Sequence, residues 1–107
     1  MSKRRYKFVV LTNAVEGRDA EFNDWYTNRH LPDVLAIPGI VGAERFELAE
    51  FQRSHLPQPY RYLAIYEIET DDLEWVTKEI GRRAGTAAMV ISEAMAEEKL
   101  AAIFKPL

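Results

Sequence analysis

Four segments of the chain are rich in the β-branched, aromatic and other apolar residues that are typical of β-strands. They span residues 5–13, 40–49, 60–69 and 99–105, and the third is the clearest strand. In the first segment, Tyr6, Phe8 and Val10 share one face. Val9 and Leu11 share the other face, so this strand is apolar on both sides. Such a strand is covered on both faces, which predicts a sheet with two buried surfaces.

Two further segments have helical periodicity. Residues 19–30 follow a turn at Glu16-Gly17-Arg18-Asp19 and place one apolar stripe on the helix, made by Phe22, Trp25, Tyr26 and either Arg29 or His30. Because Pro32 has no N–H group, we expect this helix to kink or stop there. Residues 32–36 are expected to form a second short turn, which Pro38-Gly39 ends.

The second helix is predicted to begin after Thr70-Asp71-Asp72, because acidic residues cap helix N-termini. Its residues Leu73, Val76 and Ile80 have the spacing of an inward face, and Gly81 lies near its end. Residues 84–97 have weak periodicity and are expected to be irregular.

The resulting order, β-α-β-β-α-β, predicts an α+β ferredoxin-like fold over a single domain, residues 1–107. Its antiparallel sheet of four strands carries both helices on one face. The other face is apolar too, and a chain of 107 residues has nothing left to cover it. We therefore expect a homodimer in which the open sheet faces of two copies pack together.

Composition removes several classes of function. The formal net charge is −3, and the only basic cluster is Lys3-Arg4-Arg5, so nucleic-acid binding is not expected. The absence of cysteine excludes disulfides, thiolate nucleophiles and zinc-thiolate sites, and suits the cytoplasm. No apolar run approaches the roughly 18 residues of a membrane span, and no signal peptide is expected.

The segment Phe22-Asn-Asp-Trp-Tyr-Thr-Asn-Arg-His-Leu-Pro32, followed by Ile37-Pro-Gly39, resembles the EthD-like proteins of the dimeric α/β-barrel superfamily. Their helix carries an aromatic pair and ends in a His-x-Pro step before a Pro-Gly turn. The resemblance implies a dimeric barrel in a superfamily that includes cofactor-free monooxygenases, lactone isomerases, polyketide cyclases and haem-dependent enzymes. The chain has no histidine at Asn23 or after Gly85, so a second histidine is not expected in the site.

His30 is the leading candidate for chemistry. At a helix C-terminus the imidazolium form is stabilised, and a histidine beside Trp25, Tyr26 and Arg29 could act as a general base on a phenol or an α-carbonyl proton. Alternatively, His30 caps the broken helix or bonds the free carbonyl of Asn28. Trp25 and Tyr26 either line an aromatic pocket or pack in the core.

Tyr62 and Tyr66 share one strand face, which either lines a ligand-binding barrel interior or forms a tyrosine-rich dimer interface. Arg45 either holds an anion or pairs with Glu47 or Glu67. Asp24, Asp33 and Glu21 are near His30 in sequence, so a carboxylate–histidine pair is another possibility. A lone histidine among scattered acids is not a metal ligand set, so no metal is expected.

These patterns predict a cytoplasmic homodimer that binds a small hydrophobic or aromatic molecule. If the protein is an enzyme, we expect a cofactor-independent isomerase, cyclase or monooxygenase of catabolism, with His30 as the acid–base group. Trp25, Tyr26, Arg29, Tyr62 and Tyr66 are then the expected ligand-binding residues. The alternative is a non-catalytic binding or accessory protein in which the His-x-Pro step only sets the helix geometry.

Overall fold

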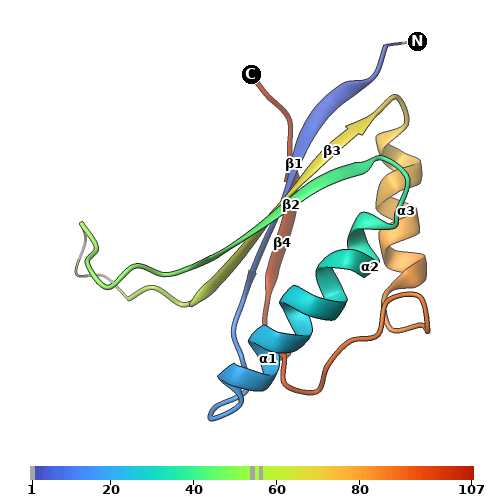
Figure 1. Ribbon diagram of the computed structural model, residues 1–107. Helices are drawn as coiled ribbons and strands as arrows, with labels where there is room; N and C mark the ends of the chain where they lie inside the picture. The colour runs from blue at the N-terminus through green and yellow to red at the C-terminus, as the bar shows by residue number, and fades with distance from the viewer. Residues whose placement is uncertain (1, 54, 56) are drawn as a thin grey trace.

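The computed structural model describes residues 2–53, 55 and 57–107. Its sheet is built from four antiparallel strands in the order β2-β3-β1-β4 (Figure 1). The strands are β1 (Arg4–Thr12), β2 (Ile40–Glu47), β3 (Tyr62–Thr70) and β4 (Leu100–Phe104). This order is that of a ferredoxin-like fold, and the predicted fold class is confirmed.

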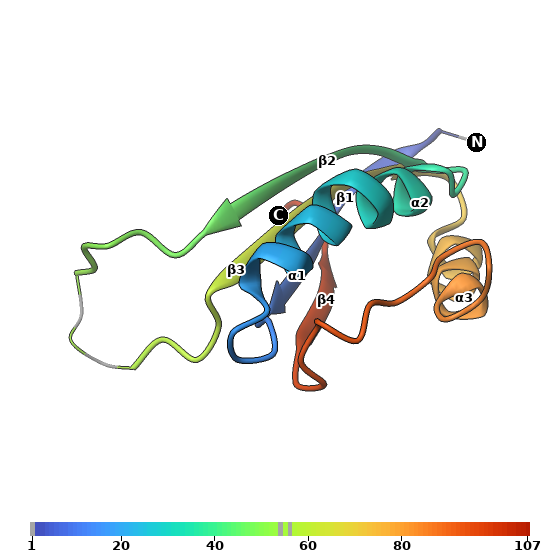
Figure 2. The ribbon, with the colours of Figure 1, turned by 60° about the horizontal axis from the view of Figure 1, so that its bottom comes forward.

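All helices lie on one face of the sheet, as the strand order predicts (Figures 1 and 2). They are α1 (Asp19–Trp25), the π-helical turn η1 (Tyr26–His30), α2 (Leu31–Leu35) and α3 (Leu73–Arg83). Strand β3 alternates strictly between fully buried and half-buried residues. Its buried residues Tyr62, Ala64, Tyr66 and Ile68 point toward the helices, where they form the core with Phe22 and other apolar side chains.

The helix does not stop at Pro32, whereas the short turn expected over residues 32–36 corresponds to α2 (Leu31–Leu35). The chain stays helical from Asp19 to Leu35, and the turn before the proline widens to π geometry, in which the Leu31 N–H bonds the carbonyl of Tyr26. Pro32 then occupies the first turn of α2, where a missing N–H group costs little. The π turn absorbs the lost hydrogen bond without interrupting the helix.

The second helix begins as predicted. The Asp72 side chain caps α3 by accepting a hydrogen bond from the Trp75 N–H at 3.0 Å. The turn between α2 and β2 is pressed against this helix. Gly39 adopts φ 101°, and a Cβ atom there would lie 3.0 Å from Val76, so glycine alone suits this position.

Residues 84–99 form an irregular segment that crosses from α3 back to β4, as their weak periodicity indicates. Isolated bridges between Ala84 and Met89 and between Ala14 and Met95 fix its path. Met89 and Ala94 are buried, so this segment closes one side of the space between the sheet and the helices.

The sheet face opposite the helices is open. Strand register places seven large apolar residues on this open face, namely Val9, Leu11, Phe46, Leu63, Ile65, Leu100 and Phe104. Phe46, Leu100 and Phe104 keep 43%, 46% and 56% of their surface exposed. Toward one end the face becomes charged, with ion pairs between Lys7 and Glu67 and between Arg5 and Glu69. Within the described residues, no helix is both long and apolar enough to cross a membrane.

Candidate functional site

A cavity of about 150 Å³ lies between the sheet, the first helical stretch and the irregular segment. We call it the His30 cavity. The side chains around it come from every layer of the fold: Phe8, Val10, Tyr26, His30, Val34, Tyr66, Ile80, Ala84, Met89, Ile91, Met95, Lys99 and Ala101. A larger surface hollow of about 390 Å³ beside Pro38 and Trp75 contains neither a histidine nor a tyrosine. The candidate catalytic and ligand-binding residues Tyr26, His30 and Tyr66 therefore lie at the smaller, apolar cavity.

The π turn determines how the aromatic residues are arranged around His30. In an α-helix, residues three or four apart are neighbours, whereas the i to i+5 bonding of a π turn aligns residues five apart. Accordingly, the Trp25 ring stacks on the His30 ring at 4.7 Å between centroids. The Tyr26 ring meets the same imidazole edge-on at 4.8 Å. His30 is therefore clamped between two aromatic rings.

His30 is only 9% exposed, and its Nδ1 atom has no hydrogen-bond partner in the described part of the chain. Burial lowers the pKa of His30 to about 4, an effect that Asp33 opposes and that Arg45 and Lys99 increase. The imidazole is thus neutral at physiological pH. This corrects the expectation of a stabilised imidazolium, because the helix continues past His30 and buries the ring instead of ending there.

Two buried tyrosine hydroxyls meet at the cavity. The Tyr66 hydroxyl donates to the Tyr26 hydroxyl at 3.0 Å, which connects β3 to the π turn. Desolvation raises the pKa of both phenols, so each hydroxyl keeps its proton. Because Tyr26 accepts from Tyr66, the proton of Tyr26 remains available for another acceptor.

Arg45 lies beneath the helix and not beside a carboxylate. Its Nη2 donates to Asn23 Oδ1 at 2.9 Å, its Nη1 donates to Thr27 Oγ1 at 3.0 Å, and its guanidinium lies 4.4 Å from the centroid of the Tyr26 ring. The expected alternative, pairing with Glu47 or Glu67, is wrong. Arg45 projects toward the helices from the inner face of β2, and the two glutamates bind other cations.

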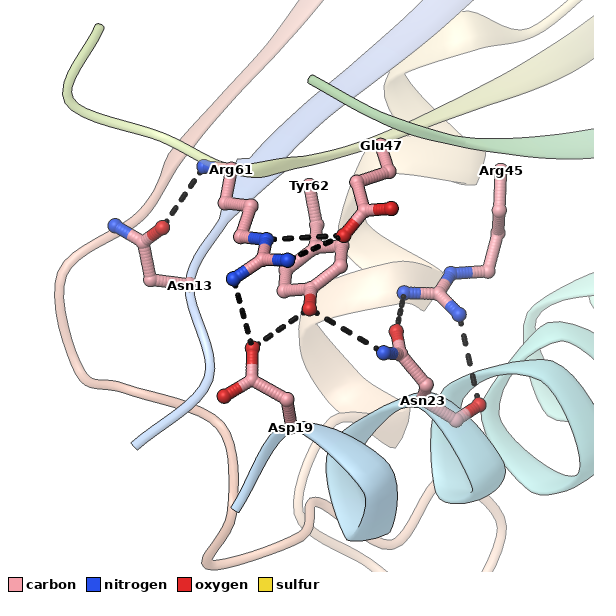
Figure 3. A network of polar contacts seen from close by, with 7 residues as sticks. All are labelled: Asn13, Asp19, Asn23, Arg45, Glu47, Arg61 and Tyr62. Carbon is pink, nitrogen blue, oxygen red and sulfur yellow. Dashed lines mark hydrogen bonds and ion pairs between the residues drawn. The ribbon is translucent and has the colours of Figure 1, made fainter. Parts of the chain in front are cut away.

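Tyr62 lies apart from the His30 cavity, in a polar network at the start of α1 (Figure 3). Its hydroxyl donates to Asp19 at 2.6 Å and accepts from Asn23 at 3.3 Å. Arg61 extends the network to Glu47 and Asp19, and Figure 3 shows these groups joined in one chain of contacts. The helices of the protein itself cover the sheet face that carries Tyr62 and Tyr66, so this face is not a dimer interface.

Of the candidate residues, the structure brings Tyr26, His30 and Tyr66 together around the cavity, with Trp25 behind the imidazole. The Trp25 indole N–H donates to the Val90 carbonyl at 3.2 Å. Arg29 does not line the cavity. Its side chain is 56% exposed, and its Nε lies 3.4 Å from Asp33 Oδ2.

The acidic residues near His30 in sequence have separate roles. Asp24 accepts a hydrogen bond from Asn28 at 2.8 Å, and Glu21 pairs with Arg18 at 2.6 Å. Of the three, Asp33 is the one whose charge raises the pKa of His30.

Sequence reasoning missed the cavity wall supplied by the irregular segment and by the residue before β4. Met89, Ile91, Met95 and Lys99 all face the cavity. The signal was the abundance of alanine and methionine in residues 84–97, because flexible methionine side chains fill irregular spaces. Among residues 2–53, 55 and 57–107, no three histidine or acidic side chains gather as a possible metal site.

No family model matches this sequence, and no curated protein matches it significantly. Solved structures do resemble it. A DABB family protein with a ferredoxin-like fold from Mesorhizobium loti has a TM-score of 0.66 at 15% identity, with 97% of this chain and 98% of that chain covered. A dimeric ferredoxin-like protein of unknown function from Thermobifida fusca has a TM-score of 0.64 at 12% identity, covering 96% and 92%.

An EthD family protein from Bacillus halodurans has a TM-score of 0.54 at 16% identity, covering 96% of this chain and 99% of that chain. Identities this low demonstrate a shared fold and leave the chemistry to the site itself. The chain therefore shares its fold with this EthD family protein, and the likeness to EthD-like proteins is confirmed at the level of the fold.

Proposed function

We propose that the His30 cavity binds a small apolar or aromatic molecule and that His30 takes a proton from it. The observation that supports this proposal is a neutral imidazole, without a partner at Nδ1, at the wall of an apolar cavity beside the Tyr26 hydroxyl. A neutral imidazole is a base, and a nearby hydroxyl stabilises the oxygen on which negative charge develops.

The roles of the surrounding residues follow from their contacts. Trp25 and Tyr26 hold the imidazole plane by ring contacts at 4.7 and 4.8 Å. The Tyr26 hydroxyl accepts a hydrogen bond from Tyr66, so its own proton is donated to the substrate oxygen. Abstraction of a proton from the carbon next to a carbonyl gives an enolate, and loss of the O–H proton of a phenol gives a phenolate. Return of the proton to a different carbon of the enolate completes an isomerisation. In a cyclisation the enolate carbon instead attacks a second carbonyl of the same molecule, and the proton passes to the new alkoxide oxygen.

Such a proton transfer needs only the imidazole and the hydroxyl, which is why we propose a cofactor-independent isomerase or cyclase. A cofactor-independent monooxygenase would start from the same carbanion and would need O₂ as a second substrate.

A second candidate is a binding protein without catalysis. The pKa of His30, lowered to about 4, favours this alternative because a weak base drives proton transfer poorly. Ligand binding would then depend on the apolar walls, and His30 would act only as a wall residue between Trp25 and Tyr26.

Solvent exchange separates these candidates without knowledge of the natural substrate. A panel of small cyclic ketones, lactones and phenols is incubated with the protein in D₂O, and loss of carbon-bound protons is followed by NMR. We expect wild-type protein to accelerate exchange for at least one compound and His30→Ala to abolish it while remaining folded by circular dichroism. If a compound binds but its carbon-bound protons exchange at the same rate with wild-type protein and with His30→Ala, the protein binds its ligand without catalysis.

We further propose that the open face is covered by a second copy of the chain. The exposed apolar residues of that face, among them Phe46, Leu100 and Phe104, support this assembly because apolar surfaces of this kind mark interfaces. The dimeric ferredoxin-like protein from Thermobifida fusca supports it by analogy. The His30 cavity lies on the helix side of the sheet, so a second copy on the open face would not cover it.

A further inference from the structure

The lining of the His30 cavity contains one formal charge. Its residues are mainly apolar, together with Tyr26, Tyr66, His30 and the exposed residue Lys99. No aspartate or glutamate belongs to the lining of this cavity. A mainly apolar cavity that offers hydrogen-bond donors and an exposed cation but no carboxylate favours a ligand with a negatively charged oxygen.

Lys99 forms no ion pair with any residue that the structure describes, whereas Lys7 and Lys78 do. It lies directly before β4, where the irregular segment rejoins the sheet at the cavity. Its charge acts on the imidazole, because Lys99 is one of the groups that lower the pKa of His30. Lys99 is thus an exposed cation that lines the cavity and whose charge acts on His30.

A second cation increases this field. Arg45 lies behind the Tyr26 ring, 4.4 Å from its centroid, and also lowers the pKa of His30. Its hydrogen bonds to Asn23 and Thr27 are to neutral groups, so its charge is not cancelled locally. The carboxylate that acts on His30 is Asp33, which does not line the cavity.

The size of the cavity limits the rest of the ligand. A volume of about 150 Å³ is comparable to that of an apolar protein cavity known to accept benzene. Phe8, Val10 and Met89 offer an apolar surface for one ring, and two fused rings would exceed the space unless the irregular segment moved.

Building on the proposed function, we propose that the ligand is a single-ring molecule carrying one anionic oxygen group, held by Lys99. The ring packs between β1 and Met89, and the oxygen group accepts from the Lys99 ammonium group and the Tyr26 hydroxyl. A carboxylate or a phenolate fits this description, and both share the same recognition chemistry.

Calorimetric titration tests this with benzoate, its neutral analogue benzamide and 4-nitrophenolate. We expect benzoate or 4-nitrophenolate to bind wild-type protein about tenfold or more tightly than benzamide, as one charge-assisted hydrogen bond gives. Lys99→Met should remove that preference while benzamide affinity stays unchanged. Lys105→Met, which changes a lysine beyond the end of β4 and outside the cavity lining, should keep it. The preferred anion tells a carboxylate ligand from a phenolate.

Three results contradict the inference in distinguishable ways. If benzamide binds as tightly as both anions, the ligand is not anionic, and the proposed function survives without this inference. If Lys99→Met keeps the full preference for the anion, another group holds the oxygen. If none of the three compounds binds at millimolar concentration, the inference fails, whereas the proposed function is decided separately by the solvent-exchange experiment.

Discussion

The Tyr66 hydroxyl donates a hydrogen bond to the Tyr26 hydroxyl at 3.0 Å, although the two residues are 40 positions apart in sequence. This contact joins the centre of β3 to the π turn that carries His30. Both tyrosines are almost completely buried, at 1% exposure each. The position of the imidazole therefore depends on the packing of the sheet as well as on the helix.

The tyrosine pair predicts a measurable coupling. Tyr66→Phe and Tyr26→Phe should each lower the free energy of unfolding by about 1 to 3 kcal/mol, because each leaves one buried hydroxyl without its partner. The double variant should cost less than the sum of the two single variants, since no orphaned hydroxyl then remains. Urea denaturation of the four proteins measures this difference, and strictly additive costs would show that the hydrogen bond contributes nothing.

The lowered pKa of His30 predicts that stability depends on pH. Burial, with help from Arg45 and Lys99 and against Asp33, takes this pKa from 6.5 to about 4. Between pH 6.5 and pH 4, His30 is protonated in the unfolded chain but neutral in the folded protein. The stabilisation is therefore complete above pH 6.5 and is lost as the pH falls toward 4. From pH 7 to pH 5 the free energy of unfolding should fall by about 2 kcal/mol.

His30→Gln provides the control for this dependence, because glutamine does not titrate. The pH-dependent loss between pH 7 and pH 5 should be smaller in this variant by the His30 contribution. Urea denaturation at the two pH values is the measurement. Parallel curves for the variant and the wild type would mean that the imidazole titrates as freely in the folded protein as in the unfolded chain.

Replacement of Arg45 by lysine should destabilise the protein, although the charge is kept. Its fork reaches Asn23 and Thr27 while its plane lies over Tyr26, and the ammonium group of lysine cannot make all three contacts. Arg45→Lys should therefore lower the free energy of unfolding by about 1 to 2 kcal/mol. Arg61→Lys is the matched control, since Arg61 is exposed and pairs at the surface, where ion pairs contribute little. Equal stability of both variants and the wild type would contradict the role given to Arg45.

The open face predicts the oligomeric state. Light scattering should give twice the chain mass for the wild type, and Ile65→Asp should give a monomer, because a carboxylate at the centre of this face is costly to bury. Val15→Lys changes an exposed apolar residue in the loop before α1 and should leave the dimer intact. A wild-type protein that is monomeric at micromolar concentration would refute the proposed assembly.

Much of the fold follows from local patterns. The β-branched and aromatic residues of 60–69 predicted β3 to within two residues, and the acidic run before Leu73 predicted the start of α3. The helix does not stop at Pro32, because the rule that a proline ends a helix assumes α-helical bonding. The π turn shifts that bonding by one residue, so the helix continues and His30 becomes a buried residue within it.

The candidate site was only partly accessible to sequence reasoning. The spacing of Trp25, Tyr26 and His30 indicated one shared face, since neighbours on a helix are close whatever the tertiary fold. Whether Tyr66 or Tyr62 reaches that face depends on strand register and on the position of the helix above the sheet. The structure brings Tyr66 to the cavity and Tyr62 to a separate polar network.

The sequence by itself determined the order of the elements, the uncovered sheet face and the presence of one histidine on an aromatic helix. These depend on periodicity and composition, which are local properties of the chain. The tertiary structure alone decided the charge and partners of that histidine. Burial and the fields of Arg45, Lys99 and Asp33 set the pKa of His30, and these groups converge only when distant segments pack around one cavity.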